Sequence, residues 1–116
     1  AYPYGCFNDT VVEALRECGI KYSRTVGSTL GFELPENPLL WNPTCHFICK
    51  DIDEIADKFL NCVAERPMLF YIWGHSYELV TEDDWQNFER FCERISGKDD
   101  VCYCSNIDVL NSMRQK

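Results

Sequence analysis

One stretch of the sequence, Met68–Trp73, constrains the fold more than any other. Its residues are all apolar or aromatic, and Gly74 and His75 follow directly. A strand buried on both faces of a parallel sheet has such an unbroken apolar run. Catalytic side chains gather at the carboxyl ends of parallel strands, and histidine transfers protons near neutral pH. His75 is therefore a candidate catalytic residue, although a histidine that only caps a loop would occupy the same position.

Strand and helix patterns alternate along the rest of the chain. The strand-like segments are the end of one at Ala1–Gly5, then Ile20–Val26, Thr44–Ile48, Met68–Trp73 and Val101–Cys104. Helices are predicted after Thr10, from about Asp51 to Ala64, after Thr81 and over Asn106–Met113, because apolar residues recur there at helical spacing. This order predicts one α/β domain, residues 1–116, with mostly parallel strands. Its open sheet edges favour part of a larger barrel or a homodimer.

The chain is acidic, with a formal net charge of −8. This charge argues against a nucleic-acid or anionic-membrane partner, and is more compatible with a neutral or cationic ligand. No apolar run approaches the roughly 18 residues of a membrane span, and no signal peptide is recognisable, so we expect a cytoplasmic protein. Eight cysteines allow disulfides, but several fall on helix faces, which favours reduced thiols. The first residue, Ala1, is consistent with a removed initiator methionine or with a segment of a longer protein.

Two further places have residues suited to chemistry. Tyr4, in Tyr2-Pro3-Tyr4-Gly5, would present its backbone N–H above the strand ends, where it could stabilise an oxyanion; a plain strand-to-helix turn is the alternative. His46 lies in a strand-like segment, as His75 follows one, and the two could meet at one site.

A metal site is a different interpretation of the cysteines. Cys45, Cys49, Cys102 and Cys104 could together hold a structural zinc ion, since tetrahedral zinc takes four such ligands. Pairs of thiols on one strand face are, however, more often part of a core.

Several of these motifs together resemble the polysaccharide deacetylases of carbohydrate esterase family four, the NodB-homology domain. The resemblance is carried by Ala1-Tyr-Pro-Tyr-Gly5, by the Cys18-Gly19-Ile-Lys-Tyr-Ser-Arg24 segment and by Trp73-Gly-His75-Ser-Tyr-Glu-Leu79. It extends over nearly the whole chain, but over only the carboxyl-terminal half of the family's domain. It implies a partial distorted (β/α) barrel with mostly parallel strands and flanking helices.

The resemblance also implies an activity, which is hydrolysis of the N-acetyl amide of amino sugars in glycans. His75 would be the general acid, and the Tyr4 backbone N–H would hold the oxyanion. Trp41, Trp73, Leu79 and His46 would line the substrate pocket. Zinc or a similar divalent metal is implied as the cofactor, but its ligands, the family's aspartate-rich first motif and histidine pair, are absent from this chain. Neither Asn37 nor Leu40, near Trp41, supplies the acid expected to orient His75.

The sequence therefore leaves three hypotheses open. The first is a metal-dependent deacetylase that needs its metal-binding half, so that these 116 residues alone would have no activity. The second is a non-catalytic deacetylase-like protein that binds glycans through Trp41, Tyr4 and Trp73, or acts in assembly. The third is an interaction domain held together by zinc.

Overall fold

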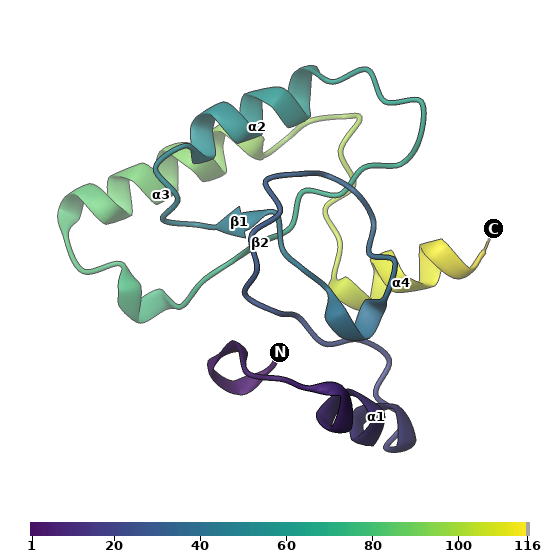
Figure 1. Cartoon of the computed structure of the whole chain (residues 1–116). Helices are drawn as coiled ribbons and strands as arrows, with labels where there is room; N and C mark the ends of the chain where they lie inside the picture. Colours follow the sequence, from purple (N-terminus) through teal and green to yellow (C-terminus); the bar gives the residue numbers. More distant parts are fainter. Residues whose placement is uncertain (116) are drawn as a thin grey trace.

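The computed structural model describes residues 1–115 of the chain (Figure 1). Its elements, in order, are the 3-10 turn η1 (Pro3–Gly5), helix α1 (Asp9–Glu17), turn η2 (Pro38–Leu40), strand β1 (Cys45–His46), helix α2 (Ile52–Asn61), strand β2 (Ile72–Trp73), turn η3 (Ser76–Glu78), helix α3 (Glu82–Ile95) and helix α4 (Asn106–Arg114). The four helices lie where helical spacing of apolar residues predicts them.

Helices α2 and α3 lie side by side and form the best-packed part of the molecule (Figure 1). Their facing sides bury Ile55, Ala56 and Phe91, and Cys45 of β1 joins the same core cluster. At the edge of this interface, Arg94 Nη1 donates to Asp57 Oδ1 at 2.6 Å. Packing of the apolar stripes, rather than helix propensity alone, therefore fixes the position of both helices against β1.

The start of α3 is set by a capping box. Thr81 Oγ1 accepts a hydrogen bond from the Asp84 N–H at 3.1 Å, and Asp84 Oδ2 accepts one from the Thr81 N–H at 2.8 Å. These bonds satisfy backbone donors that the first turn of a helix leaves free. Because α3 begins there, the preceding turn η3 lies close to the end of β2.

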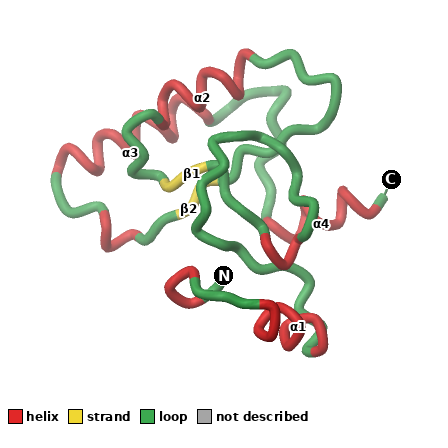
Figure 2. The backbone as a smooth tube through the Cα atoms, viewed as in Figure 1, coloured by secondary structure: helices red, strands yellow, loops and turns green. Residues whose placement is uncertain are grey.

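The sheet differs from the sequence prediction. Only β1 and β2 form a ladder, in parallel, with Cys45 opposite Ile72 and His46 opposite Trp73. Figure 2 shows that long loops replace most of the expected strands. A partial distorted (β/α) barrel with mostly parallel strands is therefore the wrong fold class for this chain, which is mainly helix and loop around two short strands.

Local hydrogen bonding explains why the strands are so short. The Tyr71 N–H donates to the side chain of Thr44 at 3.1 Å rather than to a backbone carbonyl, and the Leu69 N–H donates to Phe32 O in the long loop. Arg24 and Trp41 make one isolated parallel bridge, which is not extended because Pro43 has no N–H and the Leu39 N–H donates to the side chain of Asn37. The expected strands thus run beside one another without continuous ladders.

A second, smaller core lies at the amino-terminal end. Tyr2, Val12 and Leu39 are buried together, and the Tyr2 hydroxyl donates to Leu39 O at 2.5 Å. This cluster attaches α1 to the long loop, away from the α2–α3 layer (Figure 1). Among the described residues, no helix combines the length and apolarity that crossing a membrane requires.

Candidate functional site

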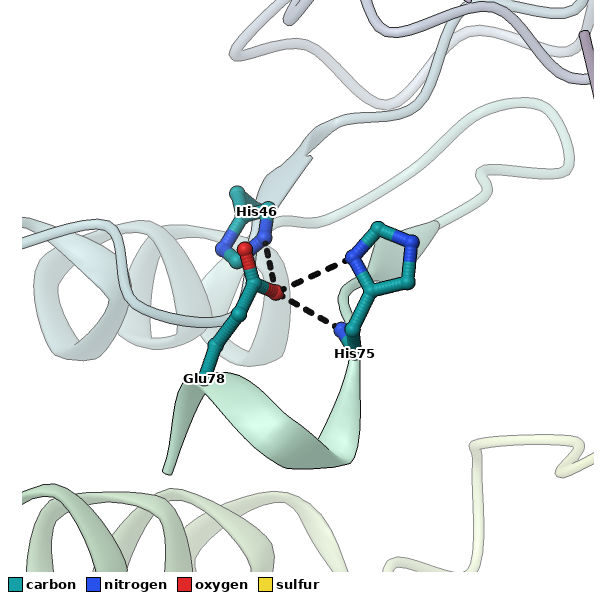
Figure 3. A group of neighbouring side chains, drawn as sticks. All are labelled: His46, His75 and Glu78. Atoms are coloured by element: carbon teal, nitrogen blue, oxygen red, sulfur yellow. Dashed lines mark hydrogen bonds and ion pairs between the residues drawn. The ribbon is translucent and has the colours of Figure 1, made fainter. Parts of the chain in front are cut away.

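Three side chains capable of proton transfer meet beyond the ends of the two strands (Figure 3). His46 is the last residue of β1, His75 lies two residues after β2, and Glu78 ends turn η3. The parallel pairing of β1 with β2 places both strand ends at the same edge, and η3 folds Glu78 back between the two rings. The structure thus brings together the two histidines of the chain.

A single carboxylate oxygen joins the cluster. Glu78 Oε2 lies 2.9 Å from His46 Nε2, 3.2 Å from His75 Nδ1 and 2.7 Å from the His75 backbone N–H (Figure 3). An ionised carboxylate only accepts hydrogen bonds. The network therefore assigns a proton to the Nδ1 atom of His75, which leaves its Nε2 atom available to exchange a proton.

The tautomer of His46 follows from a second bond. The Ile48 N–H donates to His46 Nδ1 at 3.2 Å, so Nδ1 holds a lone pair and the ring proton lies on Nε2. His46 Nε2 then donates to Glu78. His46 is the more enclosed ring, since its side chain is 18% exposed and that of His75 is 47% exposed. His46 therefore helps to hold the carboxylate, while His75 faces solvent.

The same contacts keep Glu78 charged. The pKa of its carboxyl is lowered, chiefly by the hydrogen bond from the His75 backbone N–H, with smaller contributions from the rings of His46 and His75. Glu78 is consequently an anion at neutral pH. A fixed anion beside an imidazole stabilises the ring's protonated form, as the carboxylate does in hydrolase triads.

Trp73 forms one wall of the site. Its ring centroid lies 4.5 Å from that of His46 and 5.7 Å from that of His75, both in edge-to-face orientation. The guanidinium carbon of Arg24 lies 4.2 Å from the Trp73 ring centroid. His75 also stacks on Tyr77, with the ring centroids 5.0 Å apart. The site therefore combines two imidazoles, a carboxylate, aromatic faces and one guanidinium.

The other residues predicted for the site lie outside this hydrogen-bonded cluster. Tyr4 is fully exposed and has a left-handed backbone, with φ of 54°; its N–H makes no hydrogen bond to any of residues 1–115. Trp41 is 1% exposed and packs edge-on against Tyr71, so its ring lies in the interior. Leu79 is half-buried at the end of η3. Their proposed roles in oxyanion and substrate binding remain predictions.

The cysteines do not form one four-ligand group in the part of the chain that the structure describes. All eight are free thiols. Burial, reinforced by Cys49, raises the pKa of Cys45 to about 11, which keeps that thiol protonated. Zinc ligation needs thiolates. Cys45 is therefore better explained as part of the core that it joins with Ile55 and Phe91.

The cluster itself can be tested for its fit to a divalent metal. Its three donor atoms lie within 4.8 Å of one another, a separation that a metal ion could bridge. However, a metal bound by His46 Nε2 would need a lone pair on Nε2. The Ile48 N–H donates to His46 Nδ1, so the ring proton lies on Nε2 and no lone pair is available there. The cluster therefore fits a hydrogen-bonded acid–base group and does not fit the metal that the family resemblance implies.

Sequence reasoning missed two members of the site. Glu78 stands three residues after His75, the spacing at which an acidic side chain returns to the backbone N–H at the start of a turn. This spacing is visible in the sequence. Arg24 shares the mainly apolar face of the alternating Ile20–Val26 segment with Tyr22, but nothing in the sequence indicates that this segment lies beside Trp73.

Comparison with known proteins gives no relative for this chain. No family model, curated protein or solved structure matches it.

Proposed function

We propose that the chain supplies the acid–base site of a polysaccharide-deacetylase-like hydrolase, which cleaves the N-acetyl amide of amino sugars in glycans. The observation that carries the proposal is the placement of Glu78. One of its carboxylate oxygens bonds both the ring and the backbone of His75, and also the ring of His46. This arrangement orients an exposed imidazole whose Nε2 atom faces no described acceptor.

Amide hydrolysis needs such a group at the leaving nitrogen. Water adds to the acetyl carbonyl, the carbon–nitrogen bond breaks, and the products are acetate and a free amine. The amine is a poor leaving group unless its nitrogen is protonated as the bond breaks. In our proposal, His75 donates the proton from Nε2, while Glu78 stabilises the imidazolium at Nδ1.

The family resemblance of the strand-end motif Trp73-Gly74-His75 supports the same role for His75. The aromatic faces of Trp73 and Tyr77 beside the histidines are suited to contact the apolar face of a sugar ring. The metal that the resemblance implies would have to be held by residues other than His46, His75 and Glu78, and this cluster contributes only proton transfer and orientation.

The test uses the full product of the native gene, incubated with N-acetylated chitooligosaccharides. We expect acetate release that falls by about 10²-fold or more in His75→Gln, the range of general acid catalysis. The matched variant is His46→Gln, which removes the other ring and should reduce the rate less. Equal rates in wild type and His75→Gln would contradict the proposal, as would the absence of acetate release.

Assembly without catalysis is the second candidate function, and one feature favours it. A cavity of about 890 Å³ lies along the Met68–Ile72 segment and is lined by Phe59, Phe70 and Phe91. Within residues 1–115, β2 pairs with β1 on one side only. A second copy of the chain could fill this space. Sedimentation at increasing concentration should then show a dimer, and a constant monomer mass would contradict this role.

A further inference from the structure

We infer that Arg24 binds the carboxylate of an acidic amino sugar at the site of His75. This inference rests on the proposed function, because it names the class of sugar which that site would accept. Arg24 is an unusual cation among the basic residues of this chain. Arg24 is half-buried, yet among residues 1–115 no carboxylate lies within ion-pair distance of its guanidinium.

The other basic residues show why this is unusual. Arg16, Lys58, Arg90 and Arg94 each pair with an acidic side chain. The described basic residues that lack such a partner are otherwise all exposed: Lys21, Lys50, Arg66, Lys98 and Arg114. In a chain with 19 acidic residues, a half-buried arginine without one of them is conspicuous. Removing a charge from water is unfavourable unless a partner compensates it.

Contacts within the protein use only part of the hydrogen-bonding capacity of Arg24. Its Nη1 atom donates to Thr25 O at 2.9 Å, and its guanidinium lies over Trp73, which adds a cation–π attraction. A guanidinium has five N–H donors in a planar fork. The remaining donors have no acceptor among residues 1–115 and are open to solvent, so they are free for an external acceptor, and a carboxylate fits the fork with two parallel bonds.

The position of Arg24 ties it to the candidate chemistry. The Trp73 ring that it covers also contacts His46 and His75. A sugar lying against Trp73 could thus place its acetamido group towards His75 and a carboxylate towards Arg24. A single guanidinium beside Trp73, in a protein of net charge −8, favours a ligand with one negative charge over a phosphate dianion.

The experiment compares two sugars that differ by one acidic substituent. N-acetylmuramic acid and N-acetylglucosamine share the acetamido ring, but only the first has a lactyl carboxylate. Each is titrated into the full gene product, with binding followed by tryptophan fluorescence. We expect the acidic sugar to bind at least about tenfold more tightly, the value of a charge-assisted hydrogen bond.

Variants separate recognition of charge from packing. In Arg24→Gln the preference should vanish, with both sugars binding alike, whereas Arg24→Lys should retain part of it. The control Arg114→Gln makes the same charge change on an exposed residue of α4 and should retain the full preference. Circular dichroism of each variant checks that the helices remain folded.

The outcomes distinguish this inference from the function on which it rests. Equal binding of the two sugars by wild type, or a preference unchanged in Arg24→Gln, would overturn the role of Arg24 and leave the deacetylase proposal standing. Tighter binding of N-acetylglucosamine 6-phosphate than of N-acetylmuramic acid would overturn the choice of a carboxylate. If neither N-acetylated sugar binds, both proposals fail.

Discussion

Glu78 holds His75 at two points, because the same carboxylate oxygen lies 2.7 Å from the backbone N–H and 3.2 Å from the ring Nδ1 of His75. The backbone bond fixes where the carboxylate sits, and the ring bond fixes which nitrogen of His75 carries the proton. A bond that serves the turn η3 therefore also prepares the imidazole for proton transfer.

The first prediction concerns that proton. In Glu78→Gln the neutral amide would hold the ring weakly, so His75 should lose its preference for the Nδ1–H tautomer. Nitrogen NMR of the histidine rings at neutral pH measures this directly and does not depend on catalytic turnover. Glu65→Gln, the same change on an exposed residue, is the control. An unchanged His75 tautomer in Glu78→Gln would show that Glu78 does not orient the ring.

The second prediction follows from carboxyl groups with a lowered pKa. The pKa of Glu78 is lowered chiefly by the hydrogen bond from the His75 N–H. The pKa of Asp84 is lowered chiefly by the Thr81 N–H, and that of Asp108 chiefly by the Ser105 hydroxyl. Since folding lowers each pKa, the native state binds these protons less readily than the unfolded chain does. The resulting stability is fully present above the pKa values of the unfolded chain, 4.5 for Glu and 3.8 for Asp. It is lost as the pH falls through the lower pKa values of the folded protein.

Urea unfolding as a function of pH tests this sign. The midpoint should be nearly constant around neutral pH and should decrease steadily once the pH falls below about 4.5. In Glu78→Gln the midpoint should be lower than in wild type at neutral pH, and the difference should shrink in acid. A difference that grows as the pH falls would contradict the assignment of a lowered pKa to Glu78.

These residues also show how far the sequence could predict the structure. Thr81 and Asp84 form the capping box that their spacing indicates, and the apolar stripes ending at Ile95 predicted α3 correctly. Such signals are local, since each bond joins residues within one turn. The meeting of His46 with His75 was a hypothesis from their positions at strand ends, and the structure does place them together.

The strands were predicted less well because their pairing is not local. Met68–Trp73 has the apolar run of a buried strand, but the Tyr71 N–H donates to the Thr44 side chain. Only Ile72–Trp73 therefore pairs with β1. Neither the hydrogen bond from Leu69 to Phe32 nor the contact of Arg24 with Trp73 has a sequence signal. Both depend on how the long loop folds across the strands.

A third prediction tests the close packing behind the site. A Cβ atom added at Gly74 would overlap the ring of Phe47, whose centroid lies 4.8 Å from that of His46. Gly74→Ala should therefore displace Phe47 and lower the free energy of unfolding by about 1–3 kcal/mol, the usual cost of overpacking. Chemical denaturation measures the loss, and NMR of His46 should report the disturbance at the site.

The matched control is Gly27→Ala. A Cβ atom there would meet its nearest neighbours, Asn42 Oδ1 at 3.4 Å and Thr25 Oγ1 at 3.8 Å, at ordinary contact distances, and the backbone at Gly27 does not require glycine. Its unfolding free energy should stay close to that of wild type. Equal effects of the two alanines would mean that the ring of Phe47 does not pack over Gly74 in solution.

The fourth prediction concerns the core that supports β1. Ile55 is 6% exposed and packs with Cys45 and Phe91, whereas Ile48, just after β1, is 55% exposed. Ile55→Ala should lower the free energy of unfolding by about 2–5 kcal/mol, because it removes buried methyl groups and leaves a cavity. Ile48→Ala should change it by less than about 0.5 kcal/mol, since little apolar surface is exposed anew. Both are measured by urea denaturation.

Because Cys45 immediately precedes His46, Ile55→Ala should also broaden the NMR signals of the His46 ring. A sharp, unshifted ring signal would show that the α2–α3 core does not position the site.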